Sequence, residues 1–137
     1  MTALSLLTRL QSPSISTRIG ATYELEREDF KDSRILAAVR ANLAVADPDL
    51  LDVTIGRLLL RGRDAFSVER VLCHVERTHD DLVFSSGVLS LCGLACHFPR
   101  LGETILRRFE LLPDGQLTEE NKALLANAIA KLRNVAA

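Results

Sequence analysis

The chain has 137 residues, of which 47% are hydrophobic and 26% are charged. This balance fits one folded domain with a real core and excludes an intrinsically disordered chain. The formal net charge is −1, so the sequence lacks the basic excess that a nucleic-acid-binding domain normally carries on one face.

The first half of the chain contains four stretches in which apolar residues recur at helical spacing. They span residues 2–11, 15–29, 34–46 and 48–61. Residues that favour the N-cap position precede three of these stretches: Ser14, Asp32 or Ser33, and Asp47. Pro48 fits the first helical position, where its missing N–H costs nothing, and Gly62 fits a C-cap.

Four further helices are predicted in the second half. The fifth begins after Ser67, its predicted N-cap, and the last begins after Thr118. The sixth spans residues 80–98 and carries no charged residue between Leu82 and Phe98 other than His97 when it is protonated. We expect this helix to be buried on most sides. The seventh helix is expected over residues 102–112.

No stretch alternates between apolar and polar residues for long enough to indicate a β-strand. The sequence therefore predicts an all-α protein of seven or eight helices in a single domain spanning residues 1–137. The connections are short, so neighbouring helices are expected to run antiparallel.

The predicted helices show a repeated pattern in which a small residue stands four positions before a leucine. The four units are Ala21 with Leu25, Gly56 with Leu60, Gly87 with Leu91, and Ala128 with Leu132. A small residue at this position lets a helix approach its neighbours closely. One helix pair cannot bury its apolar faces alone, so the pattern favours a stack of pairs.

Three segments resemble the first helices of HEAT-like (armadillo-type) α-helical repeats: Ser14–Leu25 (SISTRIGATYEL), Asp47–Leu58 (DPDLLDVTIGRL) and Asp81–Cys92 (DLVFSSGVLSLC). Such helices typically start with Asp or Asp-Pro and continue with a hydrophobic position, an arginine and a small-residue core ending in leucine. Only the first segment has the arginine, as Arg18. The resemblance implies a right-handed α-solenoid of antiparallel helix pairs with about four HEAT-like repeats.

The three cysteines do not form a disulfide framework, because their number is odd and all lie on apolar helical stretches: Cys73, Cys92 and Cys96. This pattern favours a reducing compartment, and the first residues do not form a signal peptide, so a cytoplasmic location is expected. Cys92 and Cys96 share a helix face and precede His97, which would suit a metal ion. The favoured interpretation is that the cysteines are small core residues, with no metal or cofactor.

Catalytic motifs are absent from the sequence. The acidic pairs Asp80–Asp81 and Glu119–Glu120 lie at predicted helix starts, where the helix dipole favours negative charge. Gly-rich phosphate loops, nucleophile elbows and zinc-protease motifs do not occur. The sequence therefore predicts a protein that is not an enzyme.

The polar faces of the third, fifth and seventh helices carry the candidate partner-binding residues. They are Arg34, Arg40, Arg70, His74, Arg77, Arg107 and Arg108. In a stack of helix pairs these side chains would form a ridge of arginines edged with carboxylates, and arginine is favoured at protein interfaces. The competing interpretation is an ordinary solvated face with ion pairs along each helix.

These observations lead to a functional hypothesis of a non-catalytic protein–protein interaction module. Its partner would be another protein, such as a toxin neutralised by a bacterial immunity protein, or a larger complex that the chain serves as adaptor or subunit. The alternative hypothesis is a nucleic-acid-binding HEAT-like protein that uses the arginine ridge. The apolar face of the first helix would either cap the stack or pair with another chain.

Overall fold

The computed structural model describes residues 3–113, 115 and 117–136, so the predicted helix start at Thr2 lies outside it. The described residues form eight α-helices and no strand, which confirms the all-α prediction. The α-helices are α1 (Ala3–Leu10), α2 (Ile15–Tyr23), α3 (Ser33–Ala41), α4 (Pro48–Gly56), α5 (Val68–Arg77), α6 (Asp81–His97), α7 (Pro99–Glu110) and α8 (Glu119–Ala136).

Four short helical segments join or extend these helices. Three are 3-10 helices, η1 (Arg27–Lys31), η2 (Asn42–Ala44) and η4 (Ala65–Ser67), and η3 (Arg57–Arg61) is a π-helix that continues α4. None of the described helices is both long enough and apolar enough to cross a membrane.

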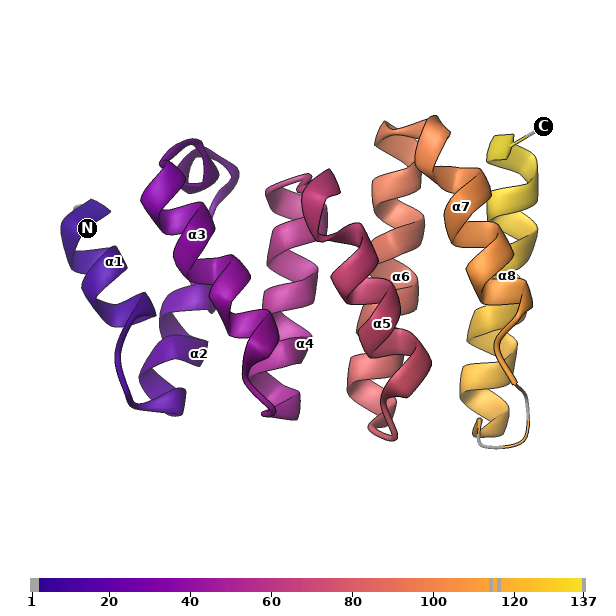
Figure 1. Ribbon diagram of the computed structural model, residues 1–137, viewed down its shortest axis with the longest axis horizontal. Coiled ribbons are helices and arrows are strands. Elements are labelled where there is room, and N and C mark those ends of the chain that lie inside the picture. The colour runs from indigo at the N-terminus through magenta and orange to yellow at the C-terminus, as the bar shows by residue number, and fades with distance from the viewer. Residues whose placement is uncertain (1–2, 114, 116, 137) are drawn as a thin grey trace.

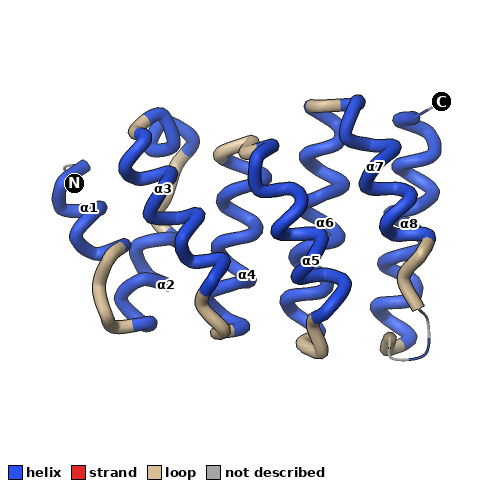
Figure 2. Tube along the Cα trace, in the orientation of Figure 1, coloured by secondary structure: helices blue, strands red, loops and turns tan. Residues whose placement is uncertain are grey.

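Successive helices alternate between two layers (Figures 1 and 2). The helices α3, α5 and α7 lie in front of α2, α4, α6 and α8, and α1 packs beside α3. In the rear layer each helix packs directly on the next, from α2 to α4, α6 and α8. In the front layer α5 packs mainly on α6 behind it, so the front helices are more widely separated from one another.

The predicted N-caps are mostly confirmed. The side-chain oxygens of five residues accept hydrogen bonds from backbone N–H groups in the following turn: Ser14, Asp32, Asp47, Asp80 and Thr118. Ser67 is different, because its hydroxyl donates to Asp64 Oδ2 at 2.6 Å and makes no cap bond.

Several helix boundaries differ from the sequence prediction. The third helix is α-helical only to Ala41 rather than to residue 46, and it continues as η2. The second helix ends at Tyr23 rather than near residue 29, because the chain turns to bury Leu25 completely and the acidic stretch after it forms η1. The seventh helix begins at Pro99, three residues earlier than expected. Pro99 occupies its first turn, and Phe98 leaves the helical region, as a residue before proline tends to do.

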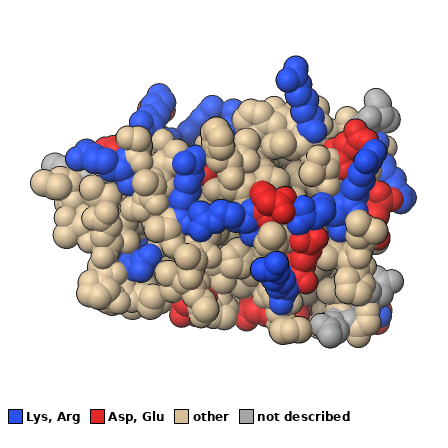
Figure 3. Space-filling model, viewed as in Figure 1, with Lys and Arg blue, Asp and Glu red and all other residues tan. Residues whose placement is uncertain are grey.

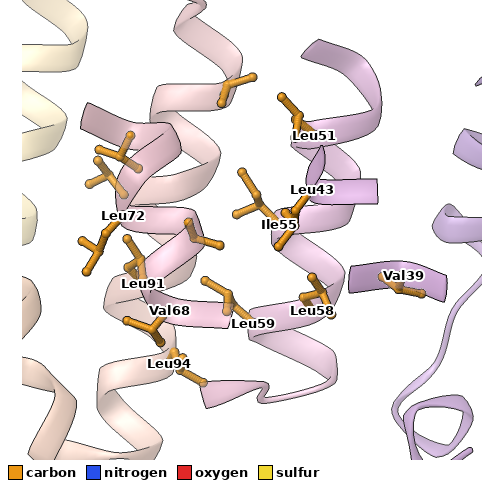
Figure 4. Close-up of a cluster of buried hydrophobic side chains, with 14 of the residues drawn as sticks. Val39, Leu43, Leu51, Ile55, Leu58, Leu59, Val68, Leu72, Leu91 and Leu94 are labelled. Atoms are coloured by element: carbon orange, nitrogen blue, oxygen red, sulfur yellow. The ribbon is translucent and has the colours of Figure 1, made fainter. Parts of the chain in front are cut away.

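The core is built from aliphatic side chains that both layers contribute. Figure 4 shows its centre, to which η3 contributes Leu58 and Leu59, α6 contributes Leu91 and Leu94, and α5 contributes Leu72. All five side chains are almost completely buried. Burial of this apolar surface stabilises the packing of the two layers.

The small-residue units of the sequence pack in different ways. Leu25, Leu91 and Leu132 are buried as expected, whereas 49% of Leu60 is exposed. The π-helical turn of η3 explains the difference, because it turns Leu58 and Leu59 inward and leaves Leu60 outside. Gly56 has open space where its Cβ would be, so it is not a packing contact.

Gly87 does fulfil the predicted packing role. A Cβ at this position would lie 2.3 Å from Val75 Cγ2 of α5, which is far inside van der Waals contact. The absence of a side chain at Gly87 therefore sets how closely α5 approaches α6. The opposite face of α6 remains open to solvent, and Leu82 and Leu89 are each 53% exposed there.

A buried polar cluster joins α2, η2 and α4. The side-chain oxygen of Asn42 accepts hydrogen bonds from Arg18 at 3.1 and 2.6 Å. The Asn42 amide nitrogen donates to the hydroxyl oxygens of Thr22 and Thr54 at 3.2 and 3.3 Å. Asn42, Thr22 and Thr54 have no exposed surface, so these bonds satisfy groups that water cannot reach.

Candidate functional site

The predicted partner-binding residues all lie on helices of the front layer. Arg34 and Arg40 are on α3, Arg70, His74 and Arg77 on α5, and Arg107 and Arg108 on α7. Figure 3 shows this face, where basic and acidic side chains interleave over α5 and α7. The structure divides the seven residues into those that the fold itself uses and those that remain available.

Arg40 belongs to the first group, because it holds a buried carboxylate. Its Nε and Nη2 donate to the two oxygens of Asp64 at 2.8 and 2.7 Å, and only 4% of the Asp64 side chain is exposed. Burial opposes ionisation of Asp64, but hydrogen bonds from Arg40 and Ser67 hold its pKa below the ordinary value. Arg40 also lies over the ring of Phe66, 5.4 Å from the ring centre.

Arg108 is also used internally. Its Nε and Nη2 donate to Glu76 at 2.8 and 2.6 Å, and its Nη1 donates to Glu69 at 2.8 and 3.1 Å, so one guanidinium joins α7 to two carboxylates of α5. The hydrogen bonds from Arg108 hold the pKa values of Glu69 and Glu76 below their ordinary range, and the two carboxylates raise the pKa of Arg108.

Three further candidates also have partners within the chain. Arg107 pairs with Glu103 one turn earlier at 2.6 Å, and Arg34 pairs with Asp32 at 2.9 Å. Both arginines are exposed, as expected for a solvated helix face. His74 Nε2 lies 2.8 Å from the carbonyl oxygen of Leu43, which can only accept, so the proton on Nε2 ties α5 to η2.

Arg70 and Arg77 are the exceptions. Both are exposed, and no described residue forms an ion pair or a hydrogen bond with either guanidinium. The carboxylates next to them in sequence, Glu69 and Glu76, are both engaged by Arg108. We call Arg70 and Arg77 the basic stripe, and Glu69 and Glu76 the acidic stripe.

The basic stripe borders an open hollow of about 420 Å³, which we call the α5 hollow. It is lined by Ala46, Leu51, Glu69, Arg70, Cys73, His74, Arg77 and Thr78. Most of the lining surface is apolar. The hollow thus combines a mostly apolar lining with two arginines that form no ion pair among the described residues.

The cysteines depart from the predicted core positions. Cys96 is exposed, because it lies on the solvent-facing side of α6, and Cys73 and Cys92 are half-buried. Burial raises the pKa of the Cys92 thiol to about 11, which keeps it protonated and unreactive near neutral pH. The part of the chain that the structure describes contains no cluster of three or more His, Cys, Asp or Glu side chains able to hold a metal ion.

The most exposed aromatic residue of the described chain was not identified from the sequence. Phe66 in η4 is 87% exposed, although it is large and apolar. It lies in the connection between two helices, so it belongs to no helical pattern of apolar residues in the sequence. The available signal is that a large apolar residue stands between the small residues Ala65 and Ser67 in a short connection.

In comparisons with known proteins, no family model, curated protein or solved structure matches this chain.

Proposed function

We propose that this chain is a cytoplasmic, non-catalytic protein-interaction module that binds a partner protein through the layer containing α3, α5 and α7. The basic stripe carries this proposal, because Arg70 and Arg77 are exposed, have no ion-pair partner among the described residues and border the α5 hollow. Arginine is enriched among the residues that dominate protein interfaces, and a neighbouring apolar surface adds binding energy when water leaves it.

The proposed architecture is a HEAT-like, right-handed α-solenoid of antiparallel helix pairs with about four repeats. Its support is the alternation of successive helices between two layers, together with buried small residues at Ala21, Gly87 and Ala128. A stack of this kind presents an extended surface that suits recognition of another protein. An immunity protein bound to a toxin and an adaptor within a larger assembly are the two roles that fit such a surface.

Nucleic acid is the alternative partner. The ion pairs that the arginines form within the chain favour a protein partner over a nucleic acid. Arg40, Arg107 and Arg108 are each neutralised by carboxylates of the chain itself. Affinity for a phosphate backbone grows with the number of cations that release counterions, and only two of the candidate arginines remain unpaired.

The test is a capture experiment with three immobilised proteins in lysate of the source cells. They are the wild type, the double variant Arg70→Glu/Arg77→Glu, and the control Lys31→Glu/Lys131→Glu, which changes net charge equally at exposed positions outside α5. We expect the wild type and the control to retain the same protein, and the Arg70→Glu/Arg77→Glu variant to lose it.

Two results would contradict the proposal. One is that the wild type retains no protein that is absent from a blank matrix. The other is that the α5 variant retains the same proteins as the wild type. Retention that disappears after nuclease treatment would support the nucleic-acid alternative instead.

A further inference from the structure

We infer that the α5 hollow binds an acidic, amphipathic helical segment of the partner, with two carboxylates on the basic stripe and an apolar side chain on the floor between them. This inference rests on the proposed function, which it makes specific, and it follows from the shape, charge and internal symmetry of α5.

The hollow follows one face of α5 along its length. On this face α5 contributes Arg70, Cys73, His74 and Arg77, a spacing that keeps them on one side of the helix. Its C-cap Thr78 lies at one end, and Glu69 lies at the edge that faces α7. Ala46 and Leu51 form the opposite wall. The hollow is therefore a short trough parallel to the helix, and a second helix is the natural shape to lie along such a trough.

The two cations of the basic stripe define the spacing of the charges they would bind. Arg70 and Arg77 are seven residues apart, which is a rise of about 10.5 Å, close to two helical turns. Carboxylates seven residues apart on another helix have the same spacing. The guanidinium group binds carboxylates through two parallel hydrogen bonds, so this arrangement has directional as well as electrostatic preference.

The other side of α5 shows how such a contact is made within the fold. The acidic stripe has the same seven-residue spacing, and Arg108 of α7 binds both of its carboxylates. In the described chain no carboxylate forms an ion pair with the basic stripe, although the charge of Arg77 helps to lower the pKa of the neighbouring Glu76. An acidic partner helix would provide carboxylates to the basic stripe, just as α7 provides the Arg108 guanidinium to the acidic stripe.

The apolar floor and the surrounding acids restrict the class of partner. Cys73, which lies one turn from each arginine, and Leu51 on the opposite wall give the hollow apolar surface, which a leucine-sized side chain would cover. Glu69, at the edge of the hollow, would repel a continuous polyanion such as RNA more than two localised carboxylates. These features favour an acidic amphipathic helix over a nucleic acid.

The experiment uses a fluorescent synthetic peptide of about 15 residues, designed to be helical, with two glutamates seven residues apart and two leucines between them on the same face. Two matched peptides replace either both glutamates by glutamine or both leucines by serine. Anisotropy titrations measure binding to the wild type, to Arg70→Gln/Arg77→Gln and to the control Lys31→Gln/Lys131→Gln. Circular dichroism melting curves establish that all three proteins are folded.

For the wild type and the control we expect the diglutamate peptide to bind at least about tenfold more tightly than the glutamine peptide. The preference should vanish in Arg70→Gln/Arg77→Gln and should weaken with added salt. The serine peptide should bind about fivefold or more weakly than the leucine peptide, because the apolar floor would then stay uncovered.

The inference is overturned if the diglutamate peptide does not bind, if it binds no better than the glutamine peptide, or if the arginine variant binds it like the wild type. It is also overturned if a short single-stranded RNA binds more tightly through the same arginines. If the capture of a partner depends on Arg70 and Arg77 but the peptide test fails, the inference of an acidic helix is wrong and the proposed function stands. Peptide binding without any captured protein removes the proposed function.

Discussion

The two sides of α5 differ in how they use charge. On the side facing α7, the acidic stripe is closed by Arg108, which contacts both carboxylates. On the side of the α5 hollow, the basic stripe stays open, and only His74 ties α5 to η2. Arginines at similar helical positions thus have different roles, and what decides the role is whether a carboxylate from a neighbouring helix reaches them.

This difference distinguishes arginines that stabilise the fold from arginines that are available to bind a partner. A paired arginine holds helices together, so its loss is expected to destabilise the fold and leave an unpaired acid behind. An unpaired arginine adds little to stability, so its replacement should leave the fold unchanged and alter only what the surface binds. The substitutions below test this separation, from the largest expected effect to the smallest.

Arg40→Ala should have the largest effect, because it leaves the nearly buried Asp64 carboxylate without its cation. We expect the free energy of unfolding to fall by about 2–3 kcal/mol. Urea titration followed by circular dichroism measures this change. Arg34→Ala on the same helix is the control, since the Arg34 side chain is exposed and its ion pair with Asp32 should add little to stability. Equal effects from the two substitutions would show that Asp64 does not need Arg40.

Gly87→Ala tests the apolar contact that places α5 on α6. The added Cβ would meet Val75 Cγ2 at 2.3 Å, so we expect a loss of about 1–3 kcal/mol in thermal or urea unfolding. Gly56→Ala is the matched control, because its Cβ would meet open space and α-helices favour alanine over glycine. That control should raise stability by about 0.5–1 kcal/mol. A neutral Gly87→Ala variant would show that α5 can move away from α6 freely.

The effects of Arg108→Ala and of substitutions in the basic stripe compare the paired and the unpaired charges of α5. It removes the cation that two carboxylates share, and we expect a loss of about 1 kcal/mol, moderated by the exposure of Glu69. Arg70→Ala and Arg77→Ala should each change the free energy of unfolding, measured by urea titration, by no more than about 0.5 kcal/mol. Should either of these match Arg108→Ala, the basic stripe would have a structural role and the contrast between the two sides would be lost.

The same pairing should have a smaller effect on how the free energy of unfolding changes at acidic pH. Arg108 lowers the pKa values of Glu69 and Glu76 in the folded protein below the ordinary value of 4.5. Their ionised forms therefore contribute stability above about pH 4.5, and this contribution is lost as the pH falls through the lowered folded values. In Arg108→Ala the unfolding free energy should fall less steeply over this acid range. Parallel curves for the two proteins would contradict the pairing.

Local patterns in the sequence predicted much of the fold. The helices, five side-chain caps and the close contact at Gly87 follow from spacing and residue type within one or two turns. The early end of α2 and the exposure of Leu60 do not, because the burial of Leu25 and the π-turn of η3 depend on how neighbouring helices pack. Local preference yields to packing at such points.

The candidate site was predicted in outline and not in detail. The sequence identifies the helices and the residue types, so all seven candidates do lie in one layer. It does not identify which of them are free, because Glu76 and Glu69 are 32 and 39 residues away from Arg108, and Asp64 is 24 residues away from Arg40. Pairs so distant in sequence depend on the arrangement of helices and leave no local pattern.

The most direct test of the contrast between the two sides of α5 is the affinity of the diglutamate peptide for the wild type and for Arg70→Gln/Arg77→Gln, measured together with their urea midpoints. We predict equal midpoints and an affinity at least about tenfold lower for the variant. Equal affinities, or a variant that is less stable than the wild type, would contradict the conclusion that Arg70 and Arg77 are free of the fold and available to a partner.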